Sequence, residues 1–198
     1  MKLSMKRTVS ITSLITVIAA LLITVNCGGS PALWKPVQPG YTKYSGKLGF
    51  SVNLPAGWMA YEDKSALLLT RHSVPLGFIM AWRHPLSTPL PYTELSINKH
   101  MQIYEIAEIV TGNLLATPGV FNLVVEELTP DEIDGKRSFS LLISYTMENG
   151  LRRRCLIYGF VSGRHYTEIG LYALEDYYFD ALLKDFFELA GSFRVSGR

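Results

Sequence analysis

Residues 139–174 read FSLLISYTMENGLRRRCLIYGFVSGRHYTEIGLYAL. Apolar and polar side chains alternate through three segments of this stretch, a pattern typical of antiparallel strands that bury one face. Asn149-Gly150 and Ser162-Gly163 separate the segments, and such pairs favour two-residue hairpin turns, of type I′ for the first. The sequence therefore predicts a meander of three strands, at Phe139–Met147, Arg152–Val161 and His165–Leu174.

Further elements are predicted on both sides of this meander. Alternation and apolar runs predict strands at Gly49–Leu54, Ala66–Arg71, Gly77–Arg83 and Val120–Leu128, with turns at Pro55-Ala56-Gly57 and Asp134-Gly135. Residues Tyr92–Thr117 carry a polar stripe spaced by three or four, which predicts a long amphipathic helix. A second helix is predicted over Asp176–Ala190, followed by a short edge strand at Ser192–Val195. This order of elements defines an α+β fold in which helices cover an antiparallel β-sheet.

The two turns of the meander also predict which side chains share a face. Two-residue loops would pair Glu148 with Leu151 and Val161 with Arg164. The core face would then carry Phe139, Leu141, Ile143, Tyr145, Leu156, Tyr158, Phe160, Ile169 and Leu171. The opposite face would be small and polar, with Ser140, Ser144, Cys155, Gly159, Gly170 and four candidate binding residues, Arg153, Tyr166, Glu168 and Tyr172. This second face is either packed closely against a helix or forms a shallow surface that binds a ligand or partner.

The first thirty residues have the order of a bacterial export signal. Three basic residues precede an apolar segment over Ile11–Val25, and Cys27 follows. The pattern resembles a lipoprotein signal, which implies cleavage before Cys27 and its acylation, with palmitate among the chains. Two or more acyl chains anchor a protein stably to a membrane. Thr24 and Asn26 depart from the usual residues of that signal, so an uncleaved anchor and an ordinary signal peptide remain alternatives.

This layout divides the chain into a signal over residues 1–26, a tether over 27–40 and a globular domain over 41–198. Removal of the signal leaves 172 of the 198 residues, which is enough for one domain with a full core. Three of the 19 basic residues lie in the signal, so 16 remain beside 17 acidic residues and no nucleic-acid partner is expected. Cys155 is expected to be a small buried apolar side chain.

No spacing in the sequence is typical of a metal site or a catalytic nucleophile. The patterns Cys-x-x-Cys, His-Glu-x-x-His and Gly-x-Ser-x-Gly do not occur. Three of the four histidines, His72, His84 and His165, follow an arginine, whose positive charge disfavours a protonated or metal-bound imidazole. We therefore expect surface histidines, no catalytic residue, no metal site and no cofactor.

Two further stretches resemble a known family. Residues 49–58 read GFSVNLPAGW, and residues 186–195 read FFELAGSFRV. The first resembles the opening hairpin of PsbP-like domains of the Mog/PsbP superfamily, and the second is similar to the end of such domains. The resemblance implies an α/β/α sandwich around an antiparallel sheet. It also implies a small exported or lipid-anchored accessory or binding subunit, although a fold alone does not give a function.

Together these patterns predict a cell-envelope protein without catalytic activity, attached to a bacterial membrane through lipid on Cys27, with its domain on the extracytoplasmic side. Its expected partner is an envelope protein or a small ligand bound at Arg153, Tyr166, Glu168 and Tyr172. Two alternatives remain from other classes. One is an envelope hydrolase whose site is assembled from residues distant in sequence, and the other is a structural subunit of an assembly.

Overall fold

A computed structural model describes residues 34–40, 42–45 and 47–196. The predicted signal, Cys27 and the first part of the predicted tether lie outside these residues. Residues 34–40, expected to belong to the tether, are part of the domain. Lys35 and Pro36 pair with Ala60 and Met59, and Val37 is buried.

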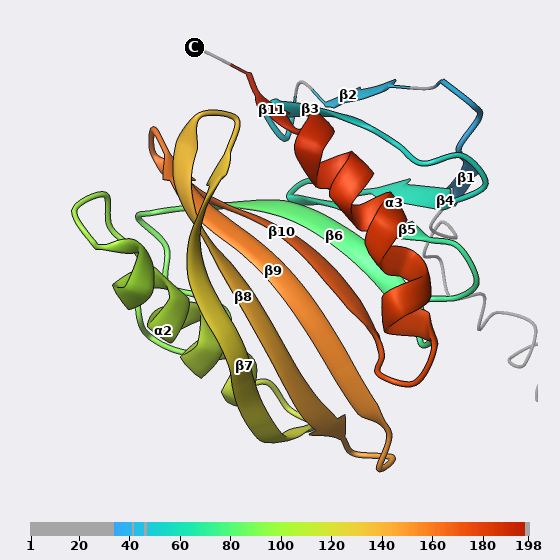
Figure 1. The fold of residues 1–198 in the computed structure, drawn as a ribbon. Coiled ribbons are helices and arrows are strands. Elements are labelled where there is room, and N and C mark those ends of the chain that lie inside the picture. Colours follow the sequence, from blue (N-terminus) through green and yellow to red (C-terminus); the bar gives the residue numbers. More distant parts are fainter. Residues whose placement is uncertain (1–33, 41, 46, 197–198) are drawn as a thin grey trace, which may run out of the picture. The chain divides into compact units, whose positions relative to one another are not determined.

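Eight antiparallel strands form the central sheet of the domain (Figure 1). In spatial order they are β1 (Lys35–Pro36), β4 (Met59–Glu62), β5 (Ala66–Thr70), β6 (Gly77–Pro85), β10 (His165–Leu174), β9 (Arg152–Ser162), β8 (Lys136–Met147) and β7 (Val120–Ile133). A second sheet contains β11 (Arg194–Val195), β3 (Phe50–Asn53) and β2 (Thr42–Ser45). With helices α2 (Ile103–Leu115) and α3 (Tyr178–Ser192), these strands confirm the predicted α+β class.

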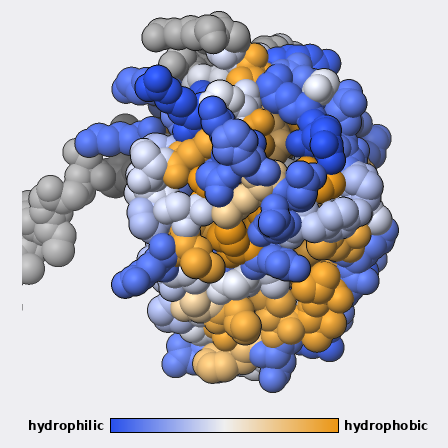
Figure 2. Space-filling view, turned by 90° about the vertical axis from the view of Figure 1, so that its left-hand side faces the viewer, coloured by the Kyte–Doolittle hydropathy of each residue, from blue (hydrophilic) through white to orange (hydrophobic). Residues whose placement is uncertain are grey.

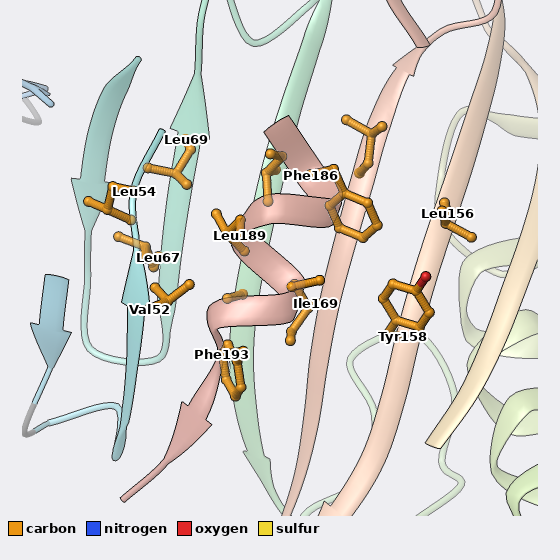
Figure 3. Packing of buried hydrophobic residues seen from close by; sticks show 14 of the residues in the cluster. Val52, Leu54, Leu67, Leu69, Leu156, Tyr158, Ile169, Phe186, Leu189 and Phe193 are labelled. Atoms are coloured by element: carbon orange, nitrogen blue, oxygen red, sulfur yellow. The ribbon is translucent and has the colours of Figure 1, made fainter. Parts of the chain in front are cut away.

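The two helices pack on opposite faces of the large sheet, so the domain has the layers of an α/β/α sandwich (Figure 1). On one face, α3 and the small sheet enclose a core that includes Val52, Leu67, Ile169, Phe186 and Phe193 (Figure 3). On the other face, α2 contributes its buried side chains Ile103, Ile106, Ala107 and Val110 to a second core. Both faces of the central strands are therefore buried.

The first hairpin of the meander differs from its predicted register by one residue. Thr146 pairs with Arg152, and the turn is closed by Gly150 N–H donating to Met147 O at 2.9 Å. Gly150 takes the left-handed conformation with φ of 82° while Asn149 does not, so the loop is the three-residue type rather than type I′. The Asn149 side chain accepts a hydrogen bond from Leu151 N–H, which stabilises this longer loop.

A slip of one residue moves every side chain of a strand to the other face. The predicted core face is therefore wrong for β8: its side chains Phe139, Leu141, Ile143 and Tyr145 pack beneath α2, with Cys155 and Ile157 of β9. The second hairpin pairs Ser162 with His165, two residues away from the expected register. An even shift preserves the faces, so β9 and β10 keep their predicted relation.

The predicted helix over 92–117 is also too long. Residues 92–102 form a loop with turns and bends, and α2 begins only after Gln102, whose N–H donates to Oε2 of Glu105 at 2.6 Å. This reciprocal capping arrangement defines a helix start. Ile97 lies in the loop before α2 and is buried in the same core. It has the sequence spacing of a helical core residue because it is buried, although it is not part of the helix.

The meander extends to a fourth strand, β7, which lies at the edge of the large sheet (Figure 1). Asp134 and Gly135 form the predicted turn before β8, and both have positive φ, as a type I′ hairpin requires. β7 is longer than predicted, and its pairing with β8 shifts twice, between Phe121 and Val124 and again between Val125 and Glu127. These irregularities are β-bulges.

Candidate functional site

The four candidate binding residues lie on the same face of β9 and β10, as predicted, but that face is not open. Arg153, Tyr166, Glu168 and Tyr172 are exposed by only 7%, 0%, 4% and 7%. The helix α2 and the aromatic side chains of β6 cover them. Tyr166 and Glu168 are therefore not at the surface, and of the two possibilities for this face the structure shows close packing against a helix, which its small residues allow.

Glu168 is the centre of a buried hydrogen-bond cluster. Its Oε1 accepts a hydrogen bond from the Tyr172 hydroxyl at 2.6 Å, and its Oε2 accepts one from the Tyr166 hydroxyl at 2.9 Å. Trp82, the cross-strand neighbour of Glu168, turns its indole nitrogen to the same carboxyl without a hydrogen bond of ordinary geometry. Both carboxyl oxygens are thus satisfied, as a buried carboxyl requires.

Burial dominates the acid–base properties of this cluster. It raises the pKa of the Glu168 carboxyl above its ordinary value, although the Tyr172 and Tyr166 hydroxyls and the Trp82 indole lower it in part. Burial likewise raises the pKa of the Tyr166 and Tyr172 hydroxyls, and the neighbouring Glu168 raises both further. Burial therefore favours the uncharged forms of Glu168, Tyr166 and Tyr172, and the hydrogen bonds between them hold the three side chains in place.

Arg153 is connected to this cluster through stacked rings. Its guanidinium lies over the Phe78 ring at 5.4 Å from the centroid and donates a hydrogen bond of 2.8 Å to Pro75 O. Phe78 in turn stacks on Tyr172 with ring centroids 5.0 Å apart. The path from Glu168 through Tyr172 and Phe78 to Arg153 fixes the position of the arginine. The four candidate residues therefore belong to one network.

The charges of three consecutive arginines are balanced in different ways. Arg152 Nε pairs with Glu175 at 2.7 Å, and Arg154 pairs with Glu126 at 2.7 Å. Both project from the face of β9 opposite to Arg153. Among the residues that the structure describes, no carboxylate lies within ion-pair distance of Arg153. Its Nε is buried and makes no hydrogen bond, so Arg153 is a buried cation without an anionic partner.

A depression of about 580 Å³ opens at Arg153. We call it the Arg153 pocket, and its lining residues are Thr117, Pro118, Gly119, Val120, Tyr145, Met147, Glu148, Asn149 and Arg153. They come from the connection between α2 and β7, from the hairpin between β8 and β9, and from the adjoining ends of strands β7, β8 and β9. Part of the predicted face therefore reaches solvent, but at Arg153 rather than at Tyr166 or Glu168.

Sequence reasoning missed several members of this site. Pro75 and Phe78 lie more than seventy residues from Arg153, and no sequence pattern links them to it. Tyr145 was assigned to the core, and the one-residue change of register brings it opposite Arg153. One signal for this site was present in the sequence. Side chains alternate between the two faces along β9, so Arg153 must lie on the opposite face from Arg152 and Arg154.

The remaining titratable groups do not form a reactive arrangement with this pocket. Cys155 is fully buried, as predicted, and burial raises the pKa of its thiol far above the ordinary value. His165 Nδ1 lies 3.2 Å from an Arg83 nitrogen, and burial with this positive charge lowers the pKa of His165. His72 and His100 are exposed, as expected. Within the described ranges, no group of histidine, cysteine and acidic side chains could hold a metal ion.

Two other surface features accompany the Arg153 pocket. A smaller groove of about 290 Å³ lies between α3 and the sheet, and its lining combines apolar residues such as Leu142, Leu156 and Phe187 with the polar Glu127, Ser140 and Arg154. Apolar side chains also gather over the end of α2 and the start of β7 (Figure 2), where Leu115, Phe121, Val124 and Val125 are roughly half exposed. In residues 34–40, 42–45 and 47–196, no helix is long and apolar enough to cross a membrane.

The arrangement of layers and strands is that of a PsbP-like domain. A solved structure of cyanobacterial PsbP (CyanoP) from Synechocystis sp. PCC 6803 is similar, with a TM-score of 0.56 and 15% identity over 85% of this chain and 95% of that chain. A crystal structure from Bacteroides thetaiotaomicron VPI-5482 matches with a TM-score of 0.52 and 14% identity over 79% of this chain. This chain spans 48% of that one, about half its length.

The Ran-binding protein Mog1p from Saccharomyces cerevisiae matches less well, with a TM-score of 0.46 and 10% identity over 83% of this chain and 96% of that chain. No family model matches the sequence, and no curated protein matches it either. The structural similarity to PsbP confirms the fold that the two short sequence stretches implied.

Proposed function

We propose that this chain is an accessory or binding protein of the bacterial cell envelope that acts without catalysis. The observation that carries the proposal is the Arg153 pocket, a concave site with a buried cation among its lining residues. Concave, mostly apolar sites with a few placed polar groups are typical of ligand binding. In this proposal Arg153 contacts the ligand, whereas Tyr172, Glu168 and Tyr166 position it through Phe78.

The proposed attachment rests on the sequence before the domain. Three basic residues, an apolar segment and Cys27 have the order of a lipoprotein signal, so Cys27 would carry the lipid that holds the domain on the extracytoplasmic side. Metabolic labelling with a palmitate analogue tests this. The label should be present in the wild type, absent in Cys27→Ser and retained in Cys155→Ser, since Cys155 is buried. Label that persists in Cys27→Ser would contradict the anchor.

The binding role is tested separately from the anchor. Wild-type protein and Arg153→Met should be incubated with an envelope extract, washed and compared by mass spectrometry of the small molecules they retain. We expect at least one compound to be retained by the wild type and lost from the variant. Turnover of esters or amides by the purified chain would instead favour the envelope hydrolase, and equal retention profiles would contradict a binding site at Arg153.

A further inference from the structure

We infer that the Arg153 pocket takes a small amphiphilic carboxylate, with the carboxylate on the Arg153 guanidinium and the apolar body against Pro118, Val120 and Met147. This inference rests on the proposed binding function and names its ligand class. It follows from the positive charge in the lining of the pocket, the chemistry of the other lining residues and the hydrogen-bond donors among them.

The charge argument begins with the arginine itself. A guanidinium stays protonated in proteins, and an unpaired buried charge is strongly disfavoured. The chain pairs Arg152 with Glu175 and Arg154 with Glu126, but gives Arg153 only a carbonyl oxygen and an aromatic face. Glu168 lies beyond Phe78 and Tyr172 in the network, and makes its hydrogen bonds to the two tyrosines. An anion in the pocket would supply the missing partner.

The residues that line the pocket indicate which kind of anion it would bind. One cation and a largely apolar lining match a ligand with one negative charge and an apolar body. Glu148 on the lining adds negative charge, which disfavours a doubly charged phosphate. The volume of about 580 Å³ lies within the range of roughly 300–1,000 Å³ that is usual for small-molecule sites.

Three other polar groups of the lining make hydrogen bonds within the chain. The Thr117 hydroxyl donates to Asn113 O at 3.0 Å, and the Asn149 side-chain oxygen accepts from Leu151 N–H. Tyr145 shares a hydrogen bond with the Cys155 thiol. Arg153 is the cationic side chain among the lining residues and is therefore the principal donor for a carboxylate. Affinity for the acid should depend on this one side chain.

The experiment measures dissociation constants of the purified full chain for hexanoate, for hexanol as the uncharged counterpart, and for inorganic phosphate. We expect hexanoate to bind at least about tenfold more tightly than either of the other two. Arg153→Met should lose at least about tenfold in affinity for hexanoate, and Arg153→Lys, which keeps the charge, should lose less. Arg154→Met, a neighbouring arginine on the opposite face, should bind hexanoate within about twofold of the wild type.

Equal affinity for hexanoate and hexanol would overturn the carboxylate assignment, while binding that still depends on Arg153 would leave the proposed binding function in place. Tighter binding of phosphate than of hexanoate would assign a different anion and overturn the inference. Absence of binding by all three also overturns it, and the envelope-extract comparison then decides the proposed function on its own. If both Arg153 variants unfold, the comparison of hexanoate with hexanol on the wild type still decides.

Discussion

The indole N–H of Trp58 donates a hydrogen bond of 2.7 Å to Oδ2 of Asp185, and it joins the residue before β4 to the middle of α3. Trp58 is fully buried, and Asp185 also contacts Arg71 at 3.5 Å. The Trp that ends the stretch GFSVNLPAGW therefore connects the sheet to the helix that covers it. This contact gives a physical reason for an indole at that position.

Trp58→Phe should destabilise the domain by about 2–3 kcal/mol, because it removes a hydrogen bond to a charged group and leaves a smaller side chain in a packed site. Asp185→Asn keeps an oxygen acceptor and should cost less. Urea unfolding of both variants measures the two losses. A Trp58→Phe variant as stable as the wild type would show that the indole contact contributes nothing.

Glu168→Gln should remove a pH dependence of stability. Because burial raises the pKa of Glu168 in the folded state, the folded chain holds a proton that the unfolded chain releases above its ordinary pKa of 4.5. The contribution of the Glu168 proton to the unfolding free energy is therefore fully present below about pH 4.5. It is lost as the pH rises through the pKa that Glu168 has in the folded chain, with a limiting slope of about 1.4 kcal/mol per pH unit. Relative to the wild type, the variant should gain stability with rising pH.

The measurement for Glu168→Gln is a series of urea melts between pH 4 and pH 8, with the difference in unfolding free energy plotted against pH. Glu188→Gln removes an exposed carboxylate and controls for the loss of one negative charge. A constant difference between Glu168→Gln and the wild type across this range would mean that the carboxyl is charged equally easily in the folded and unfolded chain.

Substitution of a buried side chain by Ala should destabilise the domain strongly on both faces of the central strands. Leu141 beneath α2, Ile169 beneath α3 and Tyr166 in the Glu168 cluster are all fully buried. Each substitution to Ala should cost about 2–5 kcal/mol in denaturant melts. Tyr104→Ala, at a half-exposed position of α2, should stay within about 0.5 kcal/mol of the wild type. A small loss for Tyr166→Ala would mean that its face opens to solvent.

Two glycines should give opposite results. A Cβ on Gly159 would lie 2.2 Å from Cζ of Phe139 and 2.6 Å from the Tyr166 hydroxyl, so Gly159→Ala should cost about 1–3 kcal/mol by overpacking. A Cβ on Gly112 in α2 meets no atom within 4 Å, so Gly112→Ala should stabilise the helix by about 0.5–1 kcal/mol. Thermal melts measure both, and a stabilising Gly159→Ala would contradict the close packing of Phe139.

Alternation and turn residues were sufficient to predict the meander, because each strand has a clear period of two. They could not decide between a two-residue and a three-residue loop, since Asn149-Gly150 suits both, and that single residue reverses the faces of β8. The helix α2 was overextended because buried Ile97 continues its spacing into a loop. Gln102 and Glu105, a capping pair, were the signal that marked the true start.

The candidate site was predicted in part. The sequence placed Arg153, Tyr166, Glu168 and Tyr172 on one face, and the structure joins them in one network. Sequence could not show that α2 covers this face, because coverage depends on packing between distant elements. The ion pairs of Arg152 and Arg154 involve partners more than twenty residues away, so the lone charge of Arg153 becomes visible only in three dimensions.

The edge strand β7 is poorly suited to pair with the same strand of a neighbouring copy. Its two bulges interrupt the row of backbone groups that another strand would need, and Pro130 lacks an N–H. Four carboxylates follow one another along it, on Glu126, Glu127, Asp131 and Glu132, so two such edges would bring like charges together. Copies crowded at high local density should therefore not extend their large sheets by pairing one β7 edge with another.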